Sequence, residues 1–325
     1  MERAFQASGG RLMKKKRACP LCGRSEYETL FVKEGFLFVR CRECQLVYVP
    51  EVLTDNIHFQ DDFYDERELA EVEPLSDRSV RGERMNRLIR EIQRVYGARK
   101  DLRILDVGCG KGWHLDFLRS KGYPKVRGLE VTKHAIEAVK ARGLEIDKGL
   151  LEEQAYPEGF WDVIYTDQVV EHLEEPQRVL KEIYRVLKKG GIFWLSVPNT
   201  NAWHIRWILK HRHRHFEGAR HLNHYTCETL GSSLEAAGFR VEKTKTYIEE
   251  MTLQRLKGVL LRPEVFDTAA IRDYKTEALK GAPTAPKNLF FKKILNRAAE
   301  PFNFPLIWLT RWRKGGAYIE MVGRK

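Results

Sequence analysis

A glycine-rich segment behind a short apolar run constrains the fold of this chain more than any other feature. Residues 104–107 read Ile-Leu-Asp-Val, and Gly108, Gly110 and Gly112 follow at alternate positions. Glycines suit such a turn because it needs backbone dihedrals that a Cβ forbids, and because a ligand must approach the backbone closely. The segment therefore predicts a buried strand that turns into a helix, with a ligand at the turn.

The spacing of these glycines differs from the dinucleotide-binding pattern. That pattern is Gly-x-Gly-x-x-Gly, whereas this chain has Gly-x-Gly-x-Gly. Glu130 ends the next apolar run, 20 residues after Gly110, where a carboxylate can accept hydrogen bonds from both hydroxyls of a ribose. The loop and the carboxylate together predict a ligand that carries a nucleoside.

Apolar runs alternate with amphipathic segments around this loop, which is typical of parallel βαβ units in an α/β fold. Strands are expected near 102–107, 125–131, 144–147, 161–166, 191–197 and 238–247, and helices near 77–96, 112–121, 133–142, 176–188 and 227–237. A closing strand is expected at 318–322, after a helical insertion at 248–314.

The chain of 325 residues is long enough for one large domain and a small satellite. Residues 1–17 are polar and are expected to be a disordered lead-in. Residues 18–50 are expected to form a ribbon, 51–76 a linker, and 77–325 the large domain.

Two Cys-x-x-Cys pairs characterise the ribbon segment. They consist of Cys19 and Cys22, and of Cys41 and Cys44, with 18 residues between the pairs. This spacing is typical of a four-thiolate zinc site, which is structural because no position stays open for water. The alternative is a metal-free pair of turns, but so short a module has too little core to fold without metal.

The other two cysteines, Cys109 and Cys227, stand apart from these pairs. The chain therefore lacks a disulfide framework, which favours a reducing compartment. No run approaches the ~18 apolar residues of a membrane span, and no apolar stretch follows the basic residues near the N-terminus. We expect a cytoplasmic protein, with peripheral contact to the inner face of a membrane as an option.

These motifs resemble class I S-adenosylmethionine-dependent methyltransferases. Besides the loop and Glu130, the resemblance rests on Phe-Trp-Asp-Val-Ile at 160–164, Glu-His-Leu at 171–173 and Leu-Lys-Lys-Gly-Gly at 187–191, and it covers about residues 80–247. It implies a Rossmann-like sheet of seven strands with helices on both faces and an antiparallel last strand. The cysteine segment is similar to the zinc-binding N-terminus of bacterial methyltransferases of small-molecule and cell-envelope biosynthesis.

The resemblance also implies a set of cofactor-binding residues. They are Asp106, Gly108, Cys109, Gly110, Gly112, Glu130, Val131, Leu150, Leu151, Asp167 and Gln168. The loop would hold the methionine part of S-adenosylmethionine, and Glu130 its ribose. Leu150 and Leu151 would flank the adenine, where the family often has an Asp and this chain has Glu152. The last two residues of the set would lie beside the methyl group.

Histidines are the candidate bases. Methyl transfer from a sulfonium is mainly a matter of positioning, and a base is needed only when the acceptor is a hydroxyl. His172 follows the fourth expected strand, and His224 lies in a histidine-rich stretch; imidazoles titrate in the range that base catalysis needs. The alternative is that His172 braces a loop and that the histidines of 211–224 form a solvated basic turn.

Three functions fit these features. The favoured one is O-methylation of a small-molecule, sugar or lipid-linked biosynthetic intermediate. An RNA methyltransferase is the second, because zinc ribbons also precede such domains, although the fourth strand ends Tyr-Thr-Asp-Gln at 165–168 instead of an Asn-Pro-Pro-Tyr-like tetrapeptide. The third, a non-catalytic scaffold, is disfavoured by the intact loop and Glu130.

Positive charge is concentrated near the C-terminus. Residues 201–325 hold 23 Lys and Arg against 12 Asp and Glu, which accounts for +11 of the net charge of +12. Such asymmetry favours an anionic partner. Residues 289–314 interleave these cations with Trp, Phe and large aliphatic residues, a composition suited to an anionic membrane interface and less to a nucleic-acid groove. A substrate lid or a dimer face is the alternative.

We therefore expect this chain to sediment with acidic liposomes more than with neutral ones, because each basic residue near an anionic surface contributes about 1 kcal/mol. Changing Arg311, Arg313 and Lys314 to Glu should reduce the bound fraction. If liposomes leave the protein in solution while single-stranded RNA binds with a steep salt dependence, the partner is RNA instead.

Overall fold

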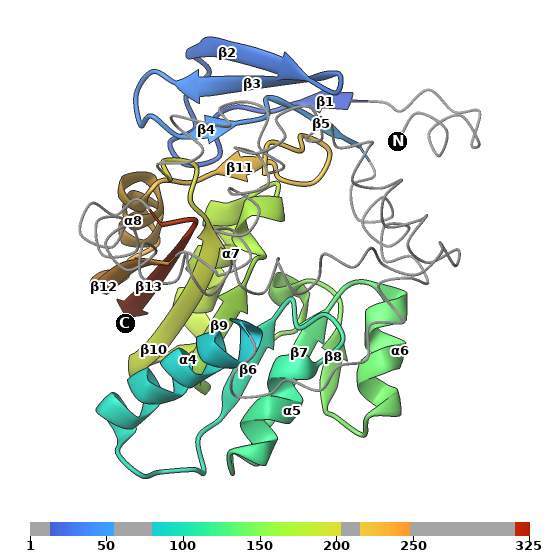
Figure 1. The fold of residues 1–325 in the computed structure, drawn as a ribbon, viewed down its shortest axis with the longest axis vertical. Coiled ribbons are helices and arrows are strands. Elements are labelled where there is room, and N and C mark those ends of the chain that lie inside the picture. The colour runs from blue at the N-terminus through green and yellow to red at the C-terminus, as the bar shows by residue number, and fades with distance from the viewer. Residues whose placement is uncertain (1–13, 55–79, 203–214, 248–315) are drawn as a thin grey trace, which may run out of the picture.

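The computed structural model describes residues 14–54, 80–202, 215–247 and 316–325 (Figure 1). The insertion expected at 248–314, including the basic aromatic stretch 289–314, lies outside the described residues, as do most of the expected lead-in and linker.

A mixed sheet of seven strands forms the centre of the large domain. Its strands are β6 (Ile104–Val107), β7 (Val126–Glu130), β8 (Ile146–Lys148), β9 (Trp161–Asp167), β10 (Leu187–Pro198), β12 (Arg240–Tyr247) and β13 (Tyr318–Arg324). Their order in space is β12-β13-β10-β9-β6-β7-β8, and β13 runs antiparallel to both of its neighbours. The predicted Rossmann-like sheet with an antiparallel last strand is confirmed.

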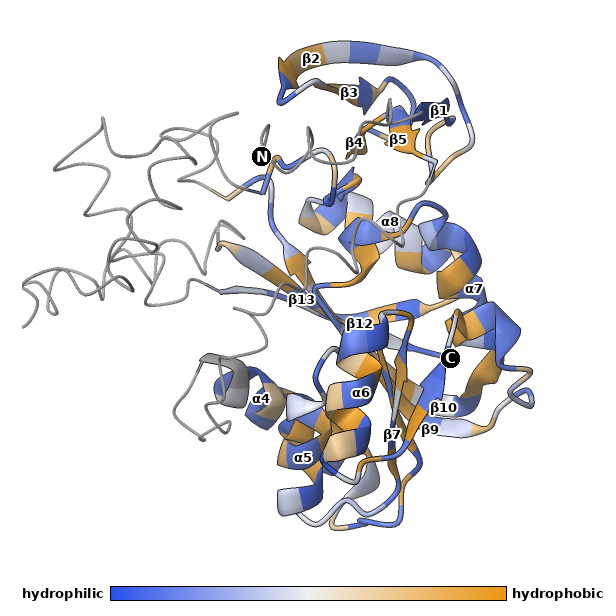
Figure 2. Cartoon of the chain, turned by 90° about the vertical axis from the view of Figure 1, so that its right-hand side faces the viewer, coloured by the Kyte–Doolittle hydropathy of each residue, from blue (hydrophilic) through white to orange (hydrophobic). Residues whose placement is uncertain are grey.

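Helices cover both faces of this sheet (Figure 1). They are α4 (Val80–Tyr96), α5 (Trp113–Ser120), α6 (Lys133–Ala141), α7 (Pro176–Val186) and α8 (Cys227–Ala236). Successive side chains of β9 point to opposite faces of the sheet. Ile164 packs with α7 and α8 on one face, whereas Val163 and Tyr165 pack with α4 and α5 on the other. Figure 2 shows the matching mixture of hydrophobic and hydrophilic residues along α5 and α6. No helix within the described ranges is long and apolar enough to span a bilayer.

The end of α7 differs from the sequence-based expectation. The helix ends at Val186, and the Lys-Lys-Gly-Gly segment that was expected to terminate it belongs to β10. A bulge between Leu187 and Ile192 absorbs these residues, with Gly190 at a φ of 74°. Lys188 is held in place by an ion pair with Asp162 at 2.5 Å. The helix therefore ends two residues earlier than expected, because β10 already begins at Leu187, which pairs with Trp161 of β9.

The cysteine segment forms a small antiparallel sheet from β2 (Tyr27–Lys33), β3 (Phe36–Cys41) and β4 (Val47–Tyr48). Glu34 and Gly35 join β2 to β3 with φ values of 51° and 75°, as a two-residue hairpin requires. The large domain contributes a fourth strand, β11 (Asn223–His224), which pairs with β4. The ribbon and the large domain therefore share one sheet (Figure 1).

A short strand lies within the segment that was expected to be the lead-in. Residues of the expected lead-in form β1 (Lys14–Lys16), which pairs antiparallel with β5 (Glu51–Leu53).

Arg17 links the two units where β4 meets β11, a contact that we call the seam. Its guanidinium donates to the carbonyl oxygens of Val49 (2.9 Å), Glu174 (2.8 Å) and Leu222 (2.7 Å) and to Oδ1 of Asn223 (3.0 Å). Hydrogen bonds from a charged donor are stronger than neutral ones. The seam thus fixes the ribbon over the loop that follows β9.

Candidate functional site

The glycine loop lies at the carboxyl end of β6 and leads into α5. Gly108, Gly110 and Gly112 have φ values of 76°, 50° and 76°, a region that glycine adopts without strain. The N–H groups of Gly108 and Cys109 donate to the carbonyl oxygen of Leu129 at 2.8 and 3.2 Å, which ties the loop to β7. A Cβ on Gly108 would lie 2.5 Å from Cγ2 of Val169. The loop therefore has the conformation that the glycine spacing predicts.

Glu130 ends β7 and faces this loop. Its Oε2 accepts from the N–H of Gly110 at 2.9 Å. Its Oε1 accepts from the N–H groups of Val131 (2.8 Å) and Thr132 (3.1 Å) and from the Thr132 hydroxyl (3.2 Å). A carboxylate can accept about four hydrogen bonds, two on each oxygen. Oε2 accepts one from the described residues and keeps capacity for a ligand hydroxyl.

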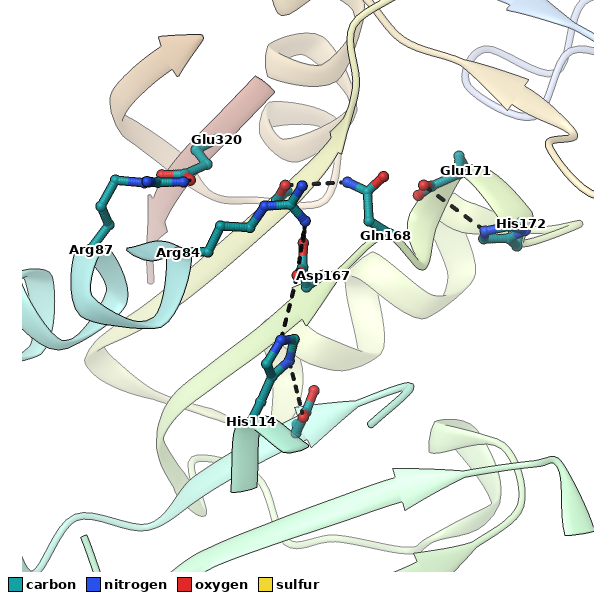
Figure 3. Close-up of polar contacts among 10 residues, drawn as sticks. Arg84, Arg87, His114, Asp167, Gln168, Glu171, His172 and Glu320 are labelled. Atoms are coloured by element: carbon teal, nitrogen blue, oxygen red, sulfur yellow. Dashed lines mark hydrogen bonds and ion pairs between the residues drawn. The ribbon is translucent and has the colours of Figure 1, made fainter. Parts of the chain in front are cut away.

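A chain of charged groups crosses the ends of β6 and β9 (Figure 3). Oδ2 of Asp106 accepts a hydrogen bond from the Tyr165 hydroxyl at 2.7 Å. His114 lies between two carboxylates, with Nδ1 3.9 Å from Asp106 and Nε2 3.7 Å from Asp167. Arg84, from α4, donates to both oxygens of Asp167 at 2.8 and 3.0 Å. Asp106 and Asp167, both expected to bind the cofactor, thus lie on either side of His114.

Sequence analysis did not identify three side chains of this polar group, namely Arg84, His114 and Tyr165. Arg84 lies on a helix before the recognisable motifs, and Tyr165 sits within an apolar strand, so neither carries a positional signal. His114 could have been found, because it lies two residues beyond Gly112, in the first turn of the helix that the glycine loop begins.

Burial dominates the electrostatics of Asp106, which is 1% exposed. Burial raises the pKa of this carboxyl well above its ordinary value, the hydrogen bond from Tyr165 opposes the shift, and the negative charges of Asp167 and Glu130 add to it. A cation bound nearby would favour the ionised form of Asp106. The arrangement therefore suits a positively charged ligand.

The two leucines expected at the adenine lie in different environments. Leu150 is 40% exposed, whereas Leu151 is 2% exposed and belongs to the hydrophobic core. Only Leu150 is open to a ligand in this structure, which corrects the expectation for Leu151. Glu152 pairs with Arg178 of α7, its Oε1 3.3 Å from Nε, instead of extending toward an adenine site.

Gln168 follows β9 in a strained conformation with a φ of 60°. Its N–H donates to the carbonyl oxygen of Ser196 at 2.8 Å, and its Nε2 donates to the Ser196 hydroxyl at 3.2 Å. Left-handed backbone at a non-glycine residue costs on the order of 1–3 kcal/mol and concentrates at functional sites. Both neighbours of the methyl group expected from the sequence, Asp167 and Gln168, are thus held rigidly at the end of β9.

His224 is part of the core beneath the ribbon. It is 2% exposed, and its ring centroid lies 5.2 Å from that of Phe38 and 5.0 Å from that of Phe216. Burial lowers the pKa of His224 well below its ordinary value. A side chain enclosed in this way cannot reach an acceptor, which corrects its assignment as a candidate base.

His172 lies in the short helix η2 (Val170–His172) after β9. Its Nδ1 is 3.0 Å from the carbonyl oxygen of Arg220, and a carbonyl oxygen can only accept, so Nδ1 carries the proton. Burial lowers its pKa well below the ordinary value, and the neighbouring His221 and Arg220 add to the shift. The neutral ring therefore has its lone pair on Nε2, as a base requires.

Two turns of the ribbon bring four sulfur atoms together: those of Cys19, Cys22, Cys41 and Cys44. The sulfurs of Cys19 and Cys44, and those of Cys22 and Cys41, are 3.4 Å apart, and all four lie within 4.8 Å of one another. Tetrahedral Zn–S bonds of about 2.3 Å place sulfurs about 3.8 Å apart. The four thiols thus match the donor set and size of a zinc site.

Comparison with known proteins agrees with this geometry. The family model of a methyltransferase domain matches residues 80–244. A probable S-adenosylmethionine-dependent methyltransferase of Mycolicibacterium smegmatis is 33% identical over 143 residues, which are 43% of this chain and 53% of that protein. The ubiquinone biosynthesis O-methyltransferase of Pectobacterium carotovorum is 26% identical over 167 residues, which are 45% of this chain and 67% of that protein. This chain thus spans about half the length of the first relative.

A solved structure shares the fold. A candidate sarcosine dimethylglycine methyltransferase from Galdieria sulphuraria superposes with a TM-score of 0.50 at 18% identity, covering 83% of this chain and 98% of that one.

Gly108→Ala should destabilise the protein more than Gly122→Ala. Both glycines have positive φ values, 76° and 84°, but a Cβ on Gly122 would meet nothing within 4 Å, whereas one on Gly108 would clash with Val169. We expect the free energy of unfolding to fall by about 1–2 kcal/mol for Gly122→Ala and by about 1–3 kcal/mol more for Gly108→Ala. Urea denaturation measures both, and equal losses would show that Val169 does not confine the loop.

Proposed function

Because this chain belongs to the S-adenosylmethionine-dependent methyltransferases, we propose that it methylates an oxygen of a small-molecule, sugar or lipid-linked biosynthetic intermediate. The observation that carries the choice of oxygen is the neutral imidazole of His172, whose Nδ1 is held by the carbonyl of Arg220. A hydroxyl must lose its proton during transfer, and a lone pair on a neutral ring can take it.

The residues of the loop support specific contacts with the cofactor. Oε2 of Glu130 is already aligned on the loop by Gly110 and would accept a hydrogen bond from a ribose hydroxyl. The carboxylates of Asp106 and Asp167 lie on either side of His114 and would offset the positive charge of the amino and sulfonium groups. Leu150, the exposed leucine after β8, would cover the adenine.

The ribbon supports a structural zinc ion at Cys19, Cys22, Cys41 and Cys44. Zinc would join the two turns, and with four sulfur ligands it would leave no position for water or acceptor. The residues around the turns are already ordered by backbone hydrogen bonds, from Gly23 to Cys19 at 2.8 Å and from Gln45 to Cys41 at 3.1 Å.

Incubating the protein with S-adenosylmethionine labelled in its methyl group and with cell extract tests the proposal. Label should enter the small-molecule or lipid fraction as a methyl group that resists mild base, as an ether does and an ester does not. Label in RNA would establish the nucleic-acid alternative. Label on a carbon or nitrogen atom would contradict methylation of an oxygen and would remove the need for His172 as a base.

Glu130→Ala should weaken the binding of S-adenosylmethionine by at least tenfold. The reason is that each ribose hydrogen bond to a buried carboxylate contributes roughly 1.5–3 kcal/mol. Titration calorimetry measures the affinity, and Glu137→Ala, which changes an exposed glutamate of α6, is the matched control. Unchanged affinity in a folded Glu130→Ala protein would contradict the assignment.

A further inference from the structure

Three side chains with lone pairs converge beneath the ribbon. Glu171 and His172 belong to η2, and His221 precedes β11. One ligand atom from each of the three lies within 4.8 Å of the others. These residues are far from the four cysteines in the sequence and form a separate group of donors.

Glu171 is the unexplained member of this group. It is 1% exposed, and neither of its carboxyl oxygens has a hydrogen-bond partner from another described residue. Figure 3 shows its side chain directed at His172, whose Nε2 is 3.9 Å from Oε1. Arg84, a nearby cation, binds Asp167 instead. Burying an ionised carboxyl group without a donor from another residue costs free energy. A cation bound beside Glu171 would offset that cost.

Both imidazoles are oriented as metal ligands usually are. Nδ1 of His172 is 3.0 Å from the carbonyl oxygen of Arg220, and Nδ1 of His221 is 2.9 Å from that of His215. In the neutral rings each Nδ1 donates its proton to a carbonyl, which leaves the lone pair on Nε2. Metal-binding histidines almost always donate their other N–H to such a partner.

We propose that Glu171, His172 and His221 bind a divalent transition-metal ion. Two imidazoles and one carboxylate are a donor set used for zinc and for iron(II). Three protein ligands leave at least one position for water or for an oxygen of the acceptor. The side chain of His172 is 19% exposed, which connects the site to solvent.

Metal binding at this site is independent of the proposed function, whereas the role of the metal in catalysis rests on that function. Four residues separate Asp167 from His172 along the loop after β9, so an acceptor oxygen on the metal would lie on the same loop as the residues expected beside the methyl group. A metal lowers the pKa of a bound hydroxyl. With metal bound, His172 would be a ligand, and the acidified hydroxyl would release its proton to solvent water instead of to a free imidazole.

Cobalt(II) titration of the purified full-length protein, with zinc already in the ribbon, tests the site. We expect one added equivalent to bind and to give the weak visible bands of a nitrogen and oxygen site, without the intense thiolate charge-transfer band of a cysteine site. Glu171→Gln and His221→Ala should weaken this binding at least tenfold. His134→Ala, which removes an exposed histidine of α6, should leave it unchanged.

The wild-type titration decides the matter even if a variant fails to fold. Failure of the wild type to bind cobalt outside the ribbon, or full binding in a folded Glu171→Gln protein, would overturn the proposal. Neither result bears on methyl transfer, which the labelling experiment measures separately.

Discussion

The guanidinium of Arg17 is the contact on which the arrangement of the upper half of the molecule depends. It joins the ribbon to Glu174, which follows η2, and to Leu222 and Asn223. Asn223 in turn donates from Nδ2 to the carbonyl oxygen of Leu173 at 2.7 Å. Burial lowers the pKa of Arg17 to about 10, so it remains charged at neutral pH. One buried cation therefore holds the ribbon and two loops of the large domain in register.

The ribbon consequently acts as part of the large domain. Its strand β4 pairs with β11, and Val39 and Tyr48 belong to the same hydrophobic core as Val170 and Tyr225. The loops held by the seam are those that carry Glu171, His172 and His221. The proposed structural zinc would therefore stabilise the acceptor side of the site indirectly, by keeping the ribbon folded above it, without taking part in chemistry.

Buried carboxyl groups at the carboxyl ends of the strands give the site its chemical character. Asp106, Glu130 and Glu171 are all buried, and burial raises the pKa of Asp106 and of Glu171. Because these pKa values are raised, the stability that the protonated carboxyls contribute is fully present below the ordinary carboxyl pKa, and it is lost as the pH rises through the raised values. A bound cation would offset the cost of ionising these buried carboxyls. A sulfonium beside Asp106 and the proposed metal beside Glu171 would each stabilise the ionised carboxylate.

The sequence by itself determined the glycine loop, the position of Glu130, the alternation of strands and helices, and the grouping of the cysteines, because each depends on residues close together in the chain. Tertiary structure alone decided that Leu151 and His224 are core residues, that Arg84 binds Asp167 across 83 positions, and that Arg17 reaches Asn223 across 206. Neither ion pairs nor the pairing of β4 with the two-residue strand β11 leave a periodic pattern in the sequence. Such contacts arise only when the packed core brings distant segments together, and they decide that His224 is enclosed in the core while His172 lies in the loop after β9.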